Sequence, residues 1–159
     1  MENIDRRGGD HAMARVAAGA EARTRWGASI VTIVSGGYLA VEIAGVIDHI
    51  RESEWPHHAD YHALTGLFLL LTLSVVAVAL AWSHVRRGDR TAWWLVTAIG
   101  IVVFGGGLLA DPLTSHGLEG GGLALLKGTT AYALVACALV LWLIAMALAR
   151  PARQVITSE

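Results

Sequence analysis

The chain is poor in cysteine and in charged residues, and both shortages exclude classes of protein. Cys137 is the only cysteine among 159 residues, which excludes an intrachain disulfide, a CxxC redox pair and a thiolate metal cage. Charged residues make up 16% of the sequence, against about 25% in a typical soluble protein. This shortage excludes a disordered chain, and the formal net charge of −1 argues against a nucleic-acid partner. The sequence therefore favours a membrane protein.

Four long apolar segments account for the shortage of charge. A helix needs roughly 20 apolar residues to cross the hydrocarbon core of a membrane. The segments that meet this length are residues 28–47, 63–82, 92–110 and 128–149. Their connections are short or moderate, which predicts an all-α, integral-membrane four-helix bundle in up-down-up-down order. We divide the chain into a basic N-terminal segment (1–25), the four-helix domain (26–150) and a C-terminal tail (151–159).

The basic residues predict how these segments are oriented. Ten of the twelve lie before the first segment, between the second and third, or after the fourth. By the positive-inside rule these parts and both termini are predicted to be cytoplasmic, in a cell membrane, with the first and third loops outside. Residues 1–25 would be either a cationic helix on the inner membrane surface or a solvated tail. Aromatic residues near the segment ends are interpreted as interfacial anchors: Trp26, Trp55, Tyr61, Trp82, Trp93 and Trp94.

Small residues within the segments predict how the helices pack. Two glycine runs, at residues 36–37 and 105–107, are expected to let helix backbones approach closely, which favours packing in lipid. Trp142 in the fourth segment is expected to be a core aromatic residue, although it could also line a cavity. Cys137 is expected to be a small buried apolar residue.

Histidines and carboxylates gather on the outward side. Five of the seven histidines lie there, close to two loops and four helix ends. Outward acids follow in part from the positive-inside asymmetry, whereas the concentration of histidines does not. The side chains that we take as candidates for a site at this position are Asp48, His49, His58, Asp60, His62 and Asp111.

Glu42 lies inside the first predicted span. It precedes His49 by seven residues, which places it about 10 Å deeper than the end of the span, and on the same helix face as Tyr38. Ionisable residues at this depth usually face a bundle interior or a cavity, and they mark functional sites. Glu42 is therefore predicted to be a buried general acid or base. The structural alternative is a protonated Glu42 that is hydrogen-bonded to Tyr38 or Thr130.

The segment before the second span carries three histidines. Pro56 suits the first turn of a helix, and a helix that starts there places His58 and His62 on one face, four residues apart. Two imidazoles at this spacing could bind a metal ion or haem, with a further ligand from Asp48, His49 or Asp111. They could equally transfer protons without a metal, or form an interfacial or capping cluster.

The same segment, residues 55–62, resembles the W-P-x-H-A-x-[FY]-H signature of small bacterial DoxX-like four-helix membrane proteins. The matching residues are Trp55, Pro56, His58, Ala59, Tyr61 and His62. The resemblance implies a four-helix bundle but no particular activity, because the activity of such proteins is unsettled. Emopamil-binding-type sterol isomerases are similar in using acidic and histidine side chains inside a membrane cavity. That analogy is at the level of the fold and transfers no residues.

Together these patterns predict an integral-membrane enzyme that acts on a hydrophobic, lipid-like substrate by cofactor-free acid-base chemistry. The reaction would be of isomerase, cyclase or epoxide-opening type. The predicted site has one acid or base, three histidines that relay protons or orient the substrate, and three aspartates that fix the histidine tautomers: Glu42, His49, His58, His62, Asp48, Asp60 and Asp111. One alternative is a metal- or haem-binding protein with His58 and His62 as ligands. The other is a non-catalytic subunit of a homo-oligomer or larger membrane complex.

Overall fold

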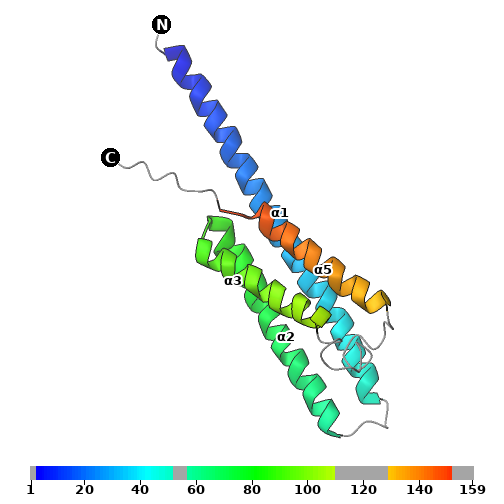
Figure 1. The fold of residues 1–159 in the computed structure, drawn as a ribbon. Coiled ribbons are helices and arrows are strands. Elements are labelled where there is room, and N and C mark those ends of the chain that lie inside the picture. Colours follow the sequence, from blue (N-terminus) through cyan, green and yellow to red (C-terminus); the bar gives the residue numbers. More distant parts are fainter. Residues whose placement is uncertain (1–2, 52–56, 110–128, 152–159) are drawn as a thin grey trace.

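The structure, a computed structural model, describes residues 3–51, 57–109 and 129–151, with side chains from residue 13 onwards except at 49, 57–59 and 129. Every regular element in these ranges is helical (Figure 1). The elements are α1 (Asn3–Arg51), α2 (His57–Ser83), a 3-10 turn η1 (Val85–Arg87), α3 (Arg90–Gly100), a π-helical turn η2 (Ile101–Gly105) and α5 (Thr129–Leu148). Residues 106–109 continue beyond η2 as α-helix.

Four helical stretches are long and apolar enough to cross a membrane. They are Met13–Asp48, Asp60–Arg87, Arg90–Leu109 and Thr130–Leu148. The prediction of an all-α chain with four candidate spans is therefore confirmed. The first stretch is longer than predicted, because α1 continues without a break from the basic N-terminal residues into the apolar segment. α1 is thus continuous across residue 25, and the division of the chain at that residue stays a prediction.

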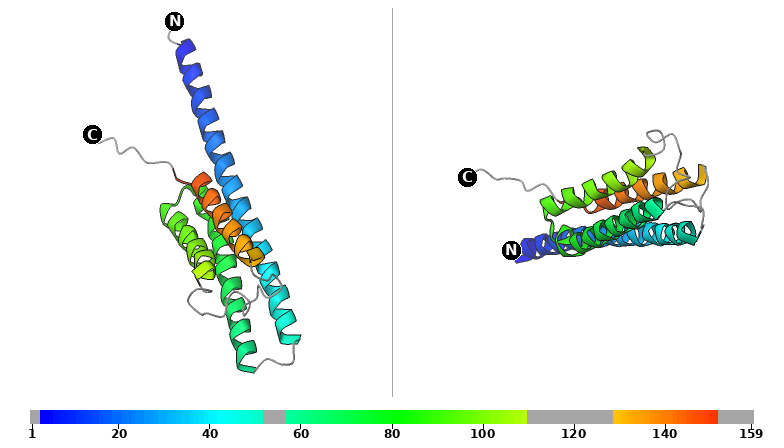
Figure 2. Two further views of the ribbon diagram at one scale, coloured as in Figure 1. Left: turned by 45° about the vertical axis from the view of Figure 1, so that its right-hand side comes forward. Right: turned by 90° about the horizontal axis from the view of Figure 1, so that it is seen from below.

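The four long helices form a ring in which each packs mainly on two neighbours. α1 contacts α2 and α5, and α3 contacts the same two helices (Figure 2). The first half of α1 projects beyond the other helices at one end of the bundle (Figure 1). At the opposite end, α1 and α2 extend beyond α3 and α5. We call the end that contains η1 and the end of α5 the basic end, and the end where α1 finishes and α2 begins the histidine end.

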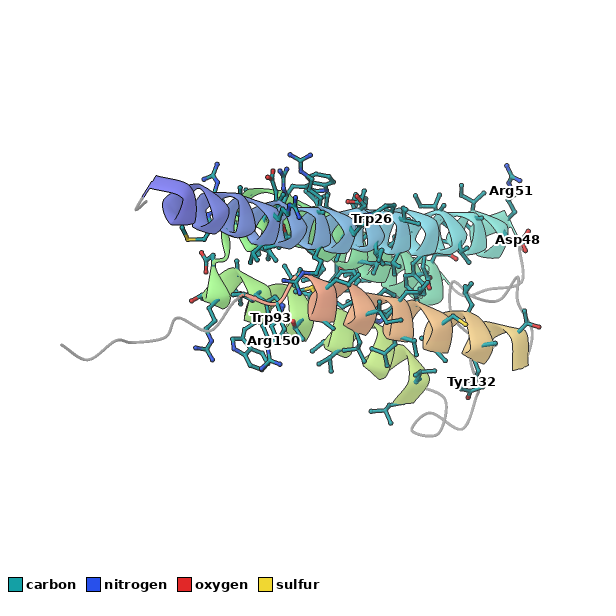
Figure 3. The ribbon with its side chains drawn as sticks, turned by 90° about the horizontal axis from the view of Figure 1, so that it is seen from above. Trp26, Asp48, Arg51, Trp93, Tyr132 and Arg150 are labelled. Atoms are coloured by element: carbon teal, nitrogen blue, oxygen red, sulfur yellow. The ribbon has the colours of Figure 1, made fainter. Side chains whose placement is uncertain are left out.

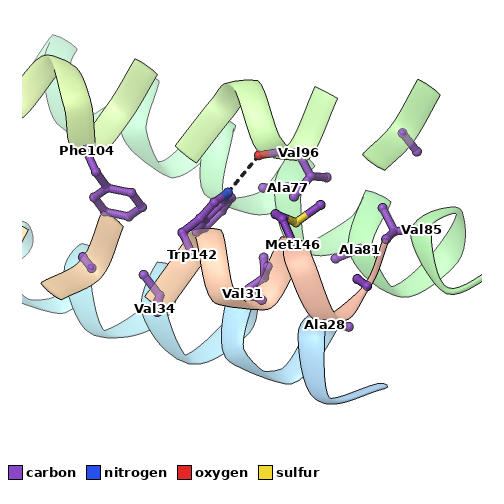
Figure 4. Close-up of a cluster of buried hydrophobic side chains, with 14 of the residues drawn as sticks. Ala28, Val31, Val34, Ala77, Ala81, Val85, Val96, Phe104, Trp142 and Met146 are labelled. Carbon is purple, nitrogen blue, oxygen red and sulfur yellow. Dashed lines mark hydrogen bonds between the residues drawn. The ribbon is translucent and has the colours of Figure 1, made fainter. Parts of the chain in front are cut away.

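The buried core consists largely of alanine and valine side chains around two large residues of α5, Trp142 and Met146 (Figure 4). Trp142 is 2% exposed, which confirms the prediction that it belongs to the core. Its indole Nε1 donates a hydrogen bond to the carbonyl oxygen of Val96 at 3.0 Å. Trp93 Nε1 likewise donates to the carbonyl oxygen of Met146 at 2.7 Å. Trp93, expected to be an interfacial anchor, is thus a half-buried donor that joins α3 to α5.

Two glycines mark the closest helix contacts. A Cβ atom on Gly27 of α1 would lie 2.6 Å from the carbonyl oxygen of Ala145 and 2.8 Å from Cβ of Ala149, both on α5 or at its end. A Cβ atom on Gly100 of α3 would overlap the indole ring of Trp142. Both positions therefore require glycine because a neighbouring helix occupies the space of a side chain.

Most glycines of the two runs expected to make these contacts do not make them. A Cβ atom on Gly36, Gly37 or Gly106 would meet no other atom within 4 Å. Gly107 alone comes near a neighbouring helix, with the Cβ position 3.4 Å from Cγ1 of Val135. The prediction therefore holds for Gly107 but not for Gly36, Gly37 and Gly106, because a small residue permits a close approach but does not cause one. A close approach also requires a neighbouring helix whose backbone or a large side chain lies opposite the small residue.

Candidate functional site

The site is built on Glu42, which is half-buried on α1 one helical turn after Tyr38. The Tyr38 and Glu42 side chains interact with each other. Of the two partners that we considered for Glu42, Tyr38 is the one beside it, and the contact runs along α1 rather than across the bundle. Thr130 is exposed at the start of α5. The carboxyl group therefore has a polar partner inside an apolar span.

Tyr38 connects this carboxyl group to the other helices. Its ring packs edge-on against Phe104 of η2, with the ring centroids 5.1 Å apart at 85°. Phe104 in turn packs against Trp142 at 5.5 Å and 61°. The Tyr38 hydroxyl oxygen lies 3.9 Å from the position that a Cβ atom of Gly107 would take. A Cβ atom at residue 107 would therefore be in van der Waals contact with the Tyr38 hydroxyl group.

An apolar groove with a volume of about 200 Å³ lies between α1 and α5, beside Tyr38. The Tyr38 side chain and the Cys137 thiol bring the only polar side-chain atoms to its lining. The residues that line the groove are Ile33, Val34, Gly37, Tyr38, Leu134, Cys137, Ala138 and Leu141. Cys137 is exposed, so the prediction that it is buried was wrong. The groove leaves its side chain uncovered, because Gly37 on the facing helix has no side chain to cover it.

Tyr38 also lines a second, much smaller cavity of about 10 Å³. Ser35 of α1 and Ser74 of α2 contribute hydroxyl groups to its lining. This volume is close to the minimum that one water molecule needs. The Tyr38 side chain therefore lies between an apolar groove and a small space with polar groups.

Three of the predicted site residues lie at the histidine end with described side chains. Asp48 is exposed near the end of α1 (Figure 3). Asp60 lies in the first turn of α2, and its Oδ1 atom is buried without a hydrogen-bond partner among the described residues. His62 is exposed, and its ring packs edge-on against Tyr61 with the centroids 5.7 Å apart at 74°.

For the remaining predicted site residues the structure describes either the backbone alone or nothing. His49 and His58 have described backbones, in α1 and α2, but their side chains lie outside the described set. Asp111 lies outside the described residues altogether. α2 begins at His57, in agreement with the helix start predicted from Pro56. The convergence of the histidines on one site therefore stays a prediction.

The metal and haem alternative is likewise still a prediction. Within residues 3–51, 57–109 and 129–151, no group of three or more histidine, cysteine or acidic side chains is placed to hold a metal ion. Of the predicted ligand pair, His58 and His62, the structure describes the side chain of His62 but not that of His58. The described side chains form no such site, and the prediction that His58 and His62 bind a metal ion or haem is not tested by them.

A cavity at the basic end was not expected from the sequence. It is lined by four arginines from three parts of the chain: Arg23, Arg86, Arg87 and Arg150. In the sequence these residues indicated only the orientation of the spans. Their convergence depends on the fold, because the elements that carry them are far apart along the chain.

No family model, curated protein or solved structure matches the chain. The resemblance to DoxX-like proteins therefore remains a prediction that depends on residues 55–62.

Proposed function

We propose that the protein is an integral-membrane enzyme that acts on a hydrophobic, lipid-like substrate by cofactor-free acid-base chemistry. The observation that carries the proposal is the pair of interacting polar side chains, Tyr38 and Glu42, inside an apolar span and next to an apolar groove. A carboxyl group at membrane depth is costly, and such groups usually mark a site. Apolar pockets with a few placed polar groups are typical of sites for small molecules.

In this proposal Glu42 is the general acid or base, and Tyr38 positions it. A phenol both donates and accepts a hydrogen bond, so Tyr38 can pass a proton between the groove and the carboxyl group. In an isomerisation one carbon of the substrate loses a proton and another gains one, and no oxidant or reductant is needed. Cyclisation and epoxide opening begin with the same transfer of a proton from the acid to the substrate. The apolar lining would hold the hydrocarbon part and exclude water.

The histidine end would connect this pair to water. We propose that His49, His58 and His62 exchange protons between Glu42 and the aqueous phase, since imidazole titrates near neutral pH. Asp48, Asp60 and Asp111 would fix the histidine tautomers by accepting a hydrogen bond from the ring. The buried Oδ1 atom of Asp60 supports this role, because a buried carboxylate oxygen needs a donor.

The placement in the membrane belongs to the same proposal. An up-down-up-down topology would put the basic end and both chain termini on the cytoplasmic side of a cell membrane, by the positive-inside rule. The histidine end and the first and third loops would then face outward. The contacts of α1 with α2 and α5, and of α3 with the same helices, support this topology.

Deuterium incorporation into membrane lipids tests the proposal even though the substrate is unidentified. Membranes that contain the full-length protein are incubated in D₂O, and the extracted lipids are analysed by mass spectrometry. A reaction in which Glu42 protonates carbon would place solvent deuterium in a C–H bond of one lipid species, or convert that species to a product of different retention. We expect Glu42→Gln to abolish this change and Tyr38→Phe to slow it about tenfold or more.

The matched control is Glu21→Gln, which changes an exposed acid on the same helix and should leave the change intact. Identical lipid labelling by the wild type and a folded Glu42→Gln variant would show that the proposal is wrong. The same conclusion follows if wild-type membranes produce no labelled or converted lipid.

A further inference from the structure

The arginine cavity, with a volume of about 630 Å³, opens at the basic end between three separate parts of the chain. Arg23 comes from α1, Arg86 and Arg87 come from η1, and Arg150 follows α5. Figure 3 shows Arg150 at this end of the bundle, near Trp93 and far from Asp48. The cavity is also remote from Glu42, since the 21 residues of α1 between Glu21 and Glu42 rise by about 30 Å.

Within the described part of the chain, positive charges outnumber negative charges in the lining of the cavity. Glu21 is the one carboxylate in the lining, beside four guanidinium groups. Its Oε1 atom already accepts a hydrogen bond from Nη2 of Arg25 at 2.6 Å and lies 3.9 Å from Nη2 of Arg86. In the described part of the chain, Arg23, Arg87 and Arg150 form no ion pair. The lining therefore carries an excess of positive charge that an anion would neutralise.

Two of the four arginines are presented by a tight turn. Gly88, directly after η1, has φ of +82°, in the left-handed region that favours glycine, and its N–H donates to the carbonyl oxygen of Val85 at 2.9 Å. Asp89, the nearest acid in sequence, is engaged elsewhere, since its Oδ1 atom accepts hydrogen bonds from the backbone N–H groups of Thr91 and Ala92 at 2.8 and 3.0 Å. The turn thus places Arg86 and Arg87 at the cavity without competition from Asp89.

Arg86 is held in position and still has an unused donor. Its guanidinium group lies over the ring of Trp82, with the carbon 5.2 Å from the ring centroid. Trp82 is itself fixed by a hydrogen bond from its Nε1 to Oγ1 of Thr32 at 2.9 Å. The Nε atom of Arg86 is buried and has no hydrogen-bond partner among the described residues. The contact with Trp82 thus holds Arg86 beside the cavity, while its Nε donor is left without a partner among the described residues.

We propose that the arginine cavity binds a phosphate group, such as the headgroup of an anionic phospholipid. Guanidinium groups bind phosphate oxygens through paired, charge-assisted hydrogen bonds. The volume lies within the range of small-molecule sites, and basic pockets between transmembrane helices bind phospholipid headgroups. The exposed tryptophans at this end of the apolar spans, among them Trp82 and Trp94, place the cavity at the level where headgroups lie.

Lipid retention by the full-length, detergent-solubilised protein tests this site. Native mass spectrometry would measure binding of phosphatidylglycerol and of phosphatidylcholine with the same acyl chains. The test variant is Arg87→Gln/Arg150→Gln, because both side chains are exposed and line the cavity. The control variant, Arg15→Gln/Arg90→Gln, removes the same charge from exposed positions outside the cavity. Thermal unfolding of both variants in phosphatidylcholine nanodiscs checks that they fold.

We expect the cavity variant to weaken phosphatidylglycerol binding about tenfold or more, and the control variant to change it less than about twofold. Inorganic phosphate is the competing probe. Displacement of the lipid by inorganic phosphate would identify a free phosphate compound as the ligand, and resistance to displacement would identify the lipid headgroup. Equal weakening by both variants, or equal wild-type binding of both lipids, would overturn the proposal.

Discussion

α5 touches α1 at Gly27 and α3 at Gly100, and Trp93 and Trp142 donate hydrogen bonds across the contact between α3 and α5. Gly36, Gly37 and Gly106, by contrast, have open space beside them, and Gly37 borders the apolar groove. The same residue type therefore serves two purposes in one bundle. Where a partner fills the space, glycine allows contact, and where none does, glycine leaves room.

This difference separates the residues that hold the bundle together from those that can serve a ligand. In lipid, apolar side chains gain little by leaving one apolar surface for another, so close packing and interhelical hydrogen bonds supply the stability. Both are concentrated around Trp142 and Gly100. We therefore expect substitutions there to change folding, and substitutions beside the groove to change activity.

The largest effect is expected from Gly100→Ala. The added methyl group would overlap the indole ring of Trp142, and overpacking of this kind costs about 3 kcal/mol in the free energy of unfolding. Gly106→Ala is the matched control, because nothing lies within 4 Å of its Cβ position, and it should be neutral or stabilising by up to about 1 kcal/mol. Thermal and denaturant unfolding in detergent would measure both. Equal destabilisation by the two variants would show that the contact with Trp142 does not distinguish Gly100 from Gly106.

Trp142→Phe should cost about 2 kcal/mol in the free energy of unfolding. It removes the indole donor and leaves the carbonyl oxygen of Val96 without this bond in a buried site. Trp26→Phe changes an exposed tryptophan of α1 and should have an effect below about 0.5 kcal/mol. The same unfolding measurements apply. A neutral Trp142→Phe would show that the bond between α3 and α5 contributes little.

Gly37→Leu should act on the proposed activity and not on folding. The new side chain would project into the apolar groove, so we expect lipid labelling in D₂O to fall about tenfold or more while unfolding stays within about 1 kcal/mol of the wild type. Gly36→Leu, at the adjacent position that does not line the groove, should retain the labelling. If both variants label lipid normally, the groove is not the substrate site.

The smallest effect is expected from Glu21→Gln at the basic end. The ion pair between Glu21 and Arg25 is exposed, with side chains 57% and 60% accessible, and exposed pairs contribute less than about 1 kcal/mol. Unfolding in detergent should therefore change little. Binding of phosphatidylglycerol should instead strengthen, because the substitution removes the one carboxylate from the lining of the arginine cavity. Weaker binding would count against the proposed phosphate site.

The fold class and the four candidate spans could be predicted because hydropathy reports directly on membrane crossing. Glu42 could also be singled out, since an ionisable residue is conspicuous in an apolar segment. The positions of helix contact could not, as Gly27 and Gly36 look equivalent in the sequence. Whether either is in contact depends on which helix lies opposite and at what height. Tertiary placement of this kind also decides that Trp93 is an interhelical donor and that Cys137 is exposed.

The π-helical turn at Ile101–Gly105 divides the third span into two segments of different register. A π-turn is equivalent to one residue inserted into an α-helix, and each residue of an α-helix rotates the chain by about 100°. Gly100, before the turn, faces Trp142, whereas Gly107, after it, faces Tyr38 and Val135. Deletion of one residue from the turn, for example the exposed Val102, would rotate the following residues by about 100° around the helix axis. Gly107 would then no longer face the Tyr38 hydroxyl group. The extra residue thus sets which residues face Tyr38, while Gly100, which precedes the turn, keeps its contact with Trp142.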